Sequence, residues 1–255
     1  MDNKKTALIL GANSDIAKKL IYIFATNQHN LILAARDTNN LHTLKSDLEI
    51  KFNINIKLVK FDILELNNHV NFYNKLQITP DVVVAAIGLL GTQKEAFNNF
   101  SFAKKVIDTN LTSQISILDI IAKDMIQKNS NIKKSKKYTI IGISSVAGDR
   151  GRPQNHTYGA AKSGFSTYLS GLRATLKRNN INVITIKPGF IETKMTSHMK
   201  FPKILKGNPE KVAKDIYKSY VKSKYVIYTP YYWYFIMTFI KILPEWLFVK
   251  LTAFK

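Results

Sequence analysis

The feature that most constrains the fold of this chain is a regular alternation of short apolar runs with longer helical patterns. The runs are apolar at nearly every position, which indicates strands buried on both faces. The intervening segments repeat apolar residues every three or four positions, as Ile16, Leu20 and Phe24 do. The expected strands cover 6–11, 30–36, 54–62, 81–88, 137–145, 181–189 and 224–230. Besides the helix after the first strand, the expected helices cover 38–51, 66–77, 95–128 (as one or two helices) and 156–178.

Strands that alternate with helices predict an α/β fold: a doubly wound, Rossmann-like parallel sheet of seven strands with helices on both faces. In such a sheet the ligand lies beyond the carboxyl ends of the strands. The 255 residues contain no internal repeat and no linker, so a single domain is expected over 1–230. Residues 231–255 are predicted to form an apolar, aromatic C-terminal tail.

The net charge and the cysteine content indicate which kinds of molecule the protein binds. The net charge is +21, from 38 Lys and Arg against 17 Asp and Glu, which favours anionic partners such as a phosphorylated cofactor, a phosphorylated substrate or an anionic membrane. Composition drift along a Lys- and Asn-rich chain is the alternative source of this charge. No nucleic-acid-binding motif accompanies it, so nucleic acid is not an expected partner. The absence of cysteine excludes disulfides and cysteine–metal sites, and no metal site is expected.

The N-terminal residues lack the long apolar stretch of a signal peptide, which predicts a cytoplasmic protein. The tail adds the expectation of a peripheral position on the inner face of a membrane. Its apolar stretch from Tyr231 to Ile240 is too short to span a bilayer, and Lys241 and Pro244 then interrupt it. Two short amphipathic helices are expected, which either lie in a membrane interface or dock onto the core or a subunit partner.

The pair most suggestive of chemistry is Tyr158 and Lys162, which lie four residues apart on a predicted helix and so share one face. A nearby ammonium favours the phenolate, so Lys162 is expected to lower the pKa of Tyr158 toward neutrality. A serine hydroxyl from another segment, Ser144 or Ser145, could hold a substrate carbonyl beside the phenol. Asn110, on a predicted helix, could bind a water that links Lys162 to solvent. This arrangement suits the protonation step of a carbonyl reduction.

A first strand–helix turn, GANSDIA, lies where a phosphate-binding turn is expected. Backbone N–H groups at the helix start and the Ser14 hydroxyl could hold a pyrophosphate, although the turn is also compatible with simple helix capping. Asp15 and Ala17 occupy places where glycines are usual. The residues expected to contact a dinucleotide here are Gly11, Asn13, Ser14, Asp15 and Ile16.

The second strand ends in AARD, with Ala35 at the tip where an acid would accept the ribose hydroxyls of NAD. Arg36 follows, and its guanidinium suits a 2′-phosphate, which favours NADP(H) over NAD(H) as the cofactor. Asp37, one place later, speaks against this preference. The alternative is that Arg36 is a surface charge with no role in cofactor binding.

Further cofactor contacts are expected after three other strands. Asp62 could accept from the adenine amino group with Ile63 beside it, or could instead cap a helix. Small residues in AAIG let a strand pass close to a ribose, and PGFIET ends a strand sharply before residues that could reach the nicotinamide. The residues in these two motifs are Ala85, Ala86, Ile87, Pro188, Gly189, Ile191 and Thr193.

Taken together, these motifs resemble the short-chain dehydrogenase/reductase family over about residues 5 to 230, and their order matches its pattern. The family spacing selects Ser145 over Ser144. The resemblance implies that Tyr158 is the general acid, that Lys162 also holds the nicotinamide ribose, and that Ser145 orients the carbonyl. It further implies that Asn110 completes a proton relay and that the protein is a homodimer or homotetramer.

The tail and the runs VVVAAIGLLGTQ and SSVAGDRGR are similar to one branch, which includes the decaprenylphosphoryl-2-keto-pentose reductases. This resemblance implies a small-molecule or lipid-linked ketone substrate, such as a lipid-linked or nucleotide-linked keto-sugar. The alternatives are a 3-oxoacyl-thioester or other apolar-ketone reductase, and an NADPH-binding redox sensor without turnover. Residues 194–208 are expected to form a mobile substrate lid, in which His198 could bind a phosphate.

Overall fold

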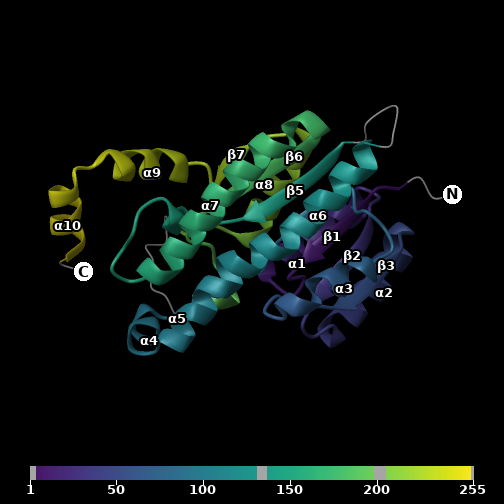
Figure 1. The fold of residues 1–255 in the computed structure, drawn as a ribbon, viewed down its shortest axis with the longest axis horizontal. Helices are drawn as coiled ribbons and strands as arrows, with labels where there is room; N and C mark the ends of the chain where they lie inside the picture. The colour runs from purple at the N-terminus through teal and green to yellow at the C-terminus, as the bar shows by residue number, and fades with distance from the viewer. Residues whose placement is uncertain (1–3, 131–136, 198–204, 254–255) are drawn as a thin grey trace.

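The computed structural model describes residues 4–130, 137–197 and 205–253. Its strands form one parallel sheet in the order β3-β2-β1-β4-β5-β6-β7, which confirms the predicted fold (Figure 1). The strands are β1 (Thr6–Leu10), β2 (Asn30–Ala35), β3 (Ile56–Lys60), β4 (Val82–Ala85), β5 (Tyr138–Ile143), β6 (Ile181–Pro188) and β7 (Val226–Thr229). Each ends one to three residues before its predicted bound, and most of the residues that follow the strand ends line the cavities described below.

Helices cover both faces of the sheet, and consecutive strand residues serve opposite faces. Ile9, Leu33 and Val84 pack with α1 (Asp15–Thr26), α2 (His42–Phe52) and α8 (Pro209–Val221). Their neighbours Leu8, Ile32 and Val83 pack with the helices of the other face. Those helices are α3 (His69–Asn74), α6 (Ser113–Ser130) and α7 (His156–Leu176). Burial on both faces explains why the strands read as continuous apolar runs.

The long segment expected to be one or two helices is broken more often than its periodicity predicts. It contains α4 (Gln93–Asn98), α5 (Phe100–Ile107), a π-helical segment (Asp108–Thr112) and then α6. Thr92 and Asn99 cap α4 and α5 by accepting hydrogen bonds from Glu95 and Phe102. The chain also contains short 3₁₀ turns over Asn39–Leu41, Leu66–Asn68, Val146–Gly148, Lys177–Asn179 and Lys194–Thr196.

The order of the strands fixes where a ligand can bind. The chain moves outward from β1 through β2 to β3 and then returns to place β4 on the other side of β1. The connections after β1 and β4 therefore diverge to opposite faces and leave a crevice beyond their carboxyl ends. The motifs predicted to contact a cofactor, after β1, β2, β3, β4 and β6, all lie at this edge.

The tail forms two short helices, α9 (Trp233–Ile242) and α10 (Glu245–Ala253), as expected. Figure 1 shows them at one end of the molecule, opposite to α2 and β3, with α10 outside the body of the sheet and its helices. Trp233 and Met237 of α9 are buried against Val146 and its neighbours. Within the described residues, no helix is both long and apolar enough to cross a membrane.

Candidate active site

Two cavities lie at the carboxyl edge of the sheet and share their central lining. One, of about 340 Å³, is lined by Tyr158 and Lys162 and is called the catalytic cavity below. The other, of about 470 Å³, is lined by Arg36 and Asp62 and is called the nucleotide cavity. Residues common to both are Asn13, Ser14, Ala86, Ile87, Gly88 and Met195. Through these shared residues the two cavities form one continuous cleft.

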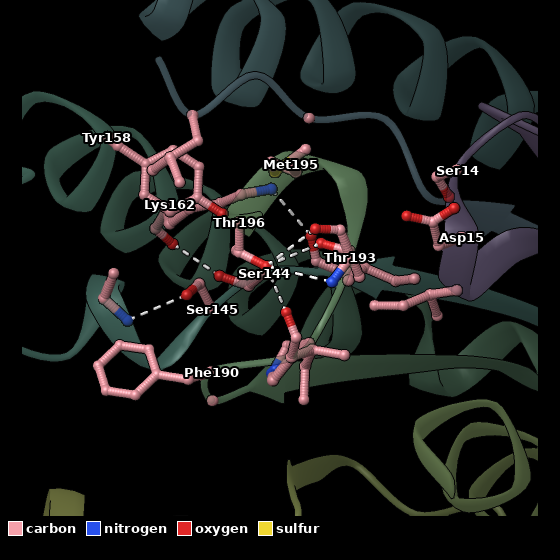
Figure 2. Close-up of a pocket in the computed structure, with 18 of the residues that line it drawn as sticks. Ser14, Asp15, Ser144, Ser145, Tyr158, Lys162, Phe190, Thr193, Met195 and Thr196 are labelled. Atoms are coloured by element: carbon pink, nitrogen blue, oxygen red, sulfur yellow. Dashed lines mark hydrogen bonds between the residues drawn. The ribbon is translucent and has the colours of Figure 1, made fainter. Parts of the chain in front are cut away.

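Helix α7 carries Tyr158 and Lys162, and two glycines bring the turn Val146–Gly148 against it. A Cβ on Gly148 would lie 2.6 Å from the carbonyl carbon of Lys162, and one on Gly159 would lie 2.8 Å from the Ala147 oxygen. Only glycine permits such close backbone approach. The contact holds Ser145, at the start of the turn, beside the phenol. Figure 2 shows Tyr158, Lys162 and Ser145 on one side of the cavity and Ser14 and Asp15 on the other.

The two adjacent serines differ in what their hydroxyls do. Ser144 Oγ donates to the Lys162 backbone oxygen at 2.9 Å and contacts Ser166 Oγ at 2.7 Å, so it fastens β5 to α7. Ser145 Oγ accepts from the Ala147 N–H at 3.1 Å and also hydrogen-bonds the Tyr158 phenol. The geometry therefore favours Ser145 as the residue that faces the reacting centre.

Burial changes the pKa of both members of the pair. Desolvation raises the pKa of Tyr158 to about 12, with the Ser145 hydrogen bond acting in the opposite direction. Desolvation also lowers the pKa of Lys162 to about 7. The expectation that Lys162 lowers the pKa of Tyr158 is wrong for the polypeptide itself, because burial outweighs any attraction between the two groups. The phenol is therefore protonated at neutral pH and ready to donate.

Lys162 and Asn110 both hydrogen-bond backbone oxygens, and both lie near Gly88. Lys162 Nζ donates to the Ile143 oxygen at 2.9 Å and lies 5.7 Å from the centre of the Tyr158 ring. The fully buried Asn110 amide donates to the Leu89 and Val106 oxygens at 2.7 and 2.8 Å. A Cβ on Gly88 would lie 3.2 Å from Asn110 Oδ1 and 3.8 Å from Lys162 Nζ. Asn110 thus lies near Lys162, in the π-helical segment that interrupts the helix.

The first turn has the shape that a dinucleotide needs. Gly11 has φ +84°, and a Cβ there would lie 2.8 Å from Ile87 and 3.0 Å from the Ala86 backbone. Ser14 caps α1 by accepting from Ala17 at 3.2 Å, and the Asn13 Oδ1 atom is buried without a partner among the described residues. The N-terminus of α1 and this free amide oxygen both face the cleft, so the residues present fit the cofactor.

The departures from the usual glycine pattern have structural roles. Asp15 accepts a hydrogen bond at 2.7 Å from the Lys194 backbone N–H, which joins the first turn to the loop after β6. Ala17 is fully buried in the core between α1 and the sheet. Ile16 lines the catalytic cavity beside Asp15.

At the far end of the nucleotide cavity, Arg36 is exposed and has no ion-pair partner in the described part of the chain. The neighbouring Asp37 carboxylate accepts from Asn39 N–H at 2.9 Å and Asn40 Nδ2 at 3.1 Å, so it stabilises its own loop. Asp62 Oδ1 accepts from Leu64 at 3.0 Å, which forms a turn and not the helix cap considered as an alternative. Ile63, also in the cavity wall, is buried.

All but one of the remaining predicted cofactor residues line the cleft. The exception is Ala85, which lines neither cavity because it is fully buried in the core. Gly189 lies directly under the buried Trp233 indole, because a Cβ there would come within 1.9 Å of Trp233 Nε1. Thr193 Oγ1 contacts Thr196 Oγ1 at 3.2 Å, and Thr196 in turn donates to the Ile191 oxygen at 2.5 Å. Ala85 ends β4 with Ala86 and Ile87 following it, and Pro188 ends β6. His198 of the expected lid lies outside the described residues.

Met195 and Thr196 line the catalytic cavity and fall within the expected lid 194–208. Sequence reasoning missed several other residues of this cavity: Leu90, Arg152, Asn155 and Phe190. All are in loops, where no periodicity marks a side chain as facing inward. The clearest available signal was the run SSVAGDRGR between Ser145 and Tyr158, because a loop joining two site residues must pass close to the site.

The comparisons with known proteins agree with this geometry. A family model described as short chain dehydrogenase matches residues 5–202. An uncharacterized oxidoreductase of Mycobacterium tuberculosis is 29% identical over 227 residues, which cover 88% of each chain. A 3-oxoacyl-[acyl-carrier-protein] reductase of Chlamydia muridarum is 28% identical over 197 residues, covering 75% of this chain and 76% of that one.

Among solved structures, a short-chain dehydrogenase from Sphingobium yanoikuyae in complex with NADPH superposes with a TM-score of 0.78 at 20% identity. The superposition covers 89% of this chain and 88% of the other. At this identity the match supports the fold, and the family follows from the match of the family model over most of the chain.

Proposed function

Because the chain belongs to the short-chain dehydrogenase family and is an NAD(P)H-dependent oxidoreductase, we propose that it reduces a ketone with NADPH. The observation that carries the proposal is the position of the Tyr158 phenol, which lines the same cavity as Ser145 and lies close to Lys162. A neutral phenol is the form that can give a proton to a carbonyl oxygen. The residues Gly11, Asn13 and Arg36 would hold the dinucleotide in the cleft.

In the proposed mechanism, the carbonyl carbon would receive a hydride from bound NADPH. Ser145 Oγ donates a hydrogen bond to the carbonyl oxygen and fixes its position beside the phenol. Tyr158 Oη gives its proton to that oxygen as negative charge develops there, which yields the alcohol. Lys162 Nζ, as the nearby cation, stabilises the phenolate that remains. Asn110, near Lys162, is the proposed holder of the water through which the phenol regains a proton.

The preference for NADPH is supported by the contrast between Arg36 and Asp37. The exposed guanidinium faces the nucleotide cavity, whereas the Asp37 carboxylate is engaged by Asn39 and Asn40. The main objection from the sequence, an acid near the ribose, is therefore weakened. A guanidinium can bind a 2′-phosphate through two parallel hydrogen bonds.

For the substrate we favour a keto-sugar carried on a lipid or a nucleotide, since the net charge of +21 suits a phosphorylated carrier. A 3-oxoacyl thioester is the second candidate, which the C. muridarum relative and the apolar Leu90, Phe190 and Met195 of the cavity favour. The intact set of Ser145, Tyr158 and Lys162 speaks against a redox sensor, which has no use for an acid–base group. Assembly as a homodimer or homotetramer stays a prediction.

Helix α9 supports a peripheral position on an anionic bilayer, because it is apolar on two opposite faces. Trp233 and Met237 form the face packed on the body, whereas Phe235, Phe239 and Ile242 repeat on the outer face. Phe239 is 66% exposed, and Trp246 of α10 is 71% exposed. The exposed Lys241 and Lys250 lie among these residues. Apolar and aromatic residues flanked by lysines favour the interface of an anionic membrane.

The proposed activity is tested by NADPH oxidation against a panel of keto-sugars and 3-oxoacyl thioesters. Tyr158→Phe should lower turnover by about 100- to 10,000-fold while leaving NADPH affinity unchanged, because only the proton donor is lost. Near-normal turnover in this variant would refute the role of Tyr158. Tight NADPH binding with no turnover of any ketone would favour the sensor.

The membrane position is tested by co-sedimentation with vesicles of neutral or anionic lipid. The double variant Phe235→Ser/Phe239→Ser should lose binding to anionic vesicles, and Ile50→Ser, at an exposed apolar residue of α2, should keep it. Equal binding of the double variant and the unmodified protein would exclude the outer face of α9 as the contact surface.

A further inference from the structure

Arg150 and Arg152, in the loop between Ser145 and Tyr158, differ in how well the protein satisfies their charge. Arg150 is fully engaged: its guanidinium donates to the Ile240 and Leu243 oxygens, each at 2.6 Å, and pairs with Glu245 at 2.7 Å. It also lies 4.1 Å above the Phe248 ring. Arg150 therefore caps α9 and holds the tail in place.

Arg152 lines the catalytic cavity, and its positive charge has no anionic partner among the described residues. Its one hydrogen-bond contact with a described residue is to Met237 Sδ at 3.1 Å, and a thioether is only a weak acceptor. No carboxylate of the described residues lies within ion-pair distance of it. Its nearest acid, Asp149, already pairs with Lys187 and accepts from Tyr228 Oη at 2.8 Å. A half-buried guanidinium in such a place lacks the anionic partner that normally offsets its desolvation.

Asn155, three residues further on, gives a second and independent observation. It lines the same cavity, and its Oδ1 atom is buried with no hydrogen-bond partner in the described ranges. It precedes α7, but its side chain does not cap the helix. A buried amide oxygen without a partner costs free energy unless a ligand or water satisfies it. One charged donor and one amide thus face the same space, next to Tyr158, with unused hydrogen-bonding capacity.

We infer that Arg152 binds an anionic oxygen group of the substrate, a phosphoryl or a carboxylate group, and that Asn155 binds a neighbouring hydroxyl. The inference rests on the proposed function for the identity of the cavity's ligand as a ketone. The cofactor's phosphates have their own positions, at the first turn and at Arg36 in the nucleotide cavity. Arg152 does not line the nucleotide cavity. In the catalytic cavity it belongs to the loop that leads to Tyr158, whereas the first turn lies across that cavity from Tyr158, so we assign the anion that Arg152 binds to the substrate.

The substrate class therefore becomes narrower: a ketone that carries an oxyanion and a hydroxyl close to the carbonyl. A phosphorylated or phosphodiester-linked keto-sugar has all three groups. A simple apolar ketone leaves Arg152 and Asn155 unpaired inside the complex, which lowers its affinity.

The test compares matched ketones that differ in charge. Dihydroxyacetone phosphate against dihydroxyacetone probes a phosphoryl group, and 4-oxopentanoate against its methyl ester probes a carboxylate. The unmodified protein should prefer one anionic member in kcat/KM, and Arg152→Met should reduce that preference by about 10- to 100-fold. Arg152→Lys should keep part of it, and Arg178→Met, which removes an exposed charge elsewhere, should keep all of it.

A binding readout separates failure of this inference from failure of the proposed function. Methyl phosphate or acetate should raise the thermal unfolding midpoint of the unmodified protein and of Tyr158→Phe, but not that of Arg152→Met. If no ketone is reduced yet this protection depends on Arg152, the anion site stands and the proposed activity fails. If ketones are reduced with no preference for the anionic members, or with a preference that survives Arg152→Met, the anion site is overturned.

Discussion

The two halves of the cleft differ in whether their polar and charged side chains have partners within the protein. In the nucleotide cavity, polar side chains are largely satisfied by their own turns: Ser14 caps α1, and Asp37 and Asp62 bond nearby backbone N–H groups. In the catalytic cavity, Lys162 and Arg152 are desolvated basic groups whose pKa is lowered by burial, with no carboxylate at ion-pair distance among the described residues. The comparison teaches that the nucleotide half keeps its charged groups exposed or hydrogen-bonded, whereas the catalytic half buries basic groups at a cost in stability so that they can act on a ligand.

The largest effect that would test this contrast is expected at Lys162. Lys162→Met should lower kcat/KM for ketone reduction by about 100-fold or more, because the phenolate left by Tyr158 loses its nearby cation. Steady-state assays with NADPH measure the loss. Activity within a few fold of normal would remove the main functional reason for burying this lysine.

Lys162→Met should also stabilise the folded protein, by an amount that depends on pH. Burial lowers the folded-state pKa of Lys162 from 10.5 to about 7, so the folded protein binds fewer protons than the unfolded chain between these values. The penalty is therefore full below about pH 7 and disappears as pH rises toward 10.5. Lys162→Met should raise the unfolding free energy by on the order of a few kcal/mol at pH 7.

Urea unfolding at several pH values measures this gain. The advantage of the variant over the unmodified protein should shrink steadily from about pH 7 to about pH 9.5, which is roughly the lower two-thirds of the titration window. A constant difference across that range would show that the lysine is not desolvated as the structure indicates.

A smaller and more selective effect is expected in the nucleotide half. Arg36→Ala should raise the KM for NADPH by about 10- to 100-fold and leave the KM for NADH nearly unchanged, because only the 2′-phosphate contact is lost. Its stability should change little, since the guanidinium is exposed and makes no ion pair in the described chain. Equal losses for both cofactors would contradict a 2′-phosphate site.

The smallest effect is expected at the junction of the two halves. Asp15→Ala removes the acceptor for the Lys194 N–H and should raise the KM for the ketone by about 2- to 10-fold, while Asp15→Asn keeps an acceptor and should change it less. Substrate titrations at saturating NADPH measure both variants. Identical behaviour of the two would indicate that the charge of Asp15, and not its hydrogen bond, matters.

Much of the site follows from the sequence because periodicity places its residues. Once the strands are located, Gly11, Arg36, Asp62 and Ser145 must lie at one edge of the sheet, and the four-residue spacing puts Tyr158 and Lys162 on one helix face. These statements need only the geometry of strands and helices.

What the sequence could not provide depends on burial and on the paths of loops. The direction of the Tyr158 pKa shift depends on how completely water is excluded, which no spacing reveals. The roles of Arg150 and Arg152 depend on the path of their loop, which the ion pair of Asp149 with Lys187 and the bond from Tyr228 hold against β6 and β7. Neither contact is visible as a local pattern.

The positions of the two tryptophans, the only ones in the chain, have a practical consequence. Trp233 lies buried against Gly189, a residue that lines the catalytic cavity, and Trp246 lies exposed on α10. A reduced nicotinamide ring absorbs where indole emits, so the buried indole should transfer its excitation to bound NADPH. The exposed indole should instead shift its emission to the blue on entering lipid, so fluorescence of the unlabelled protein can follow both events separately.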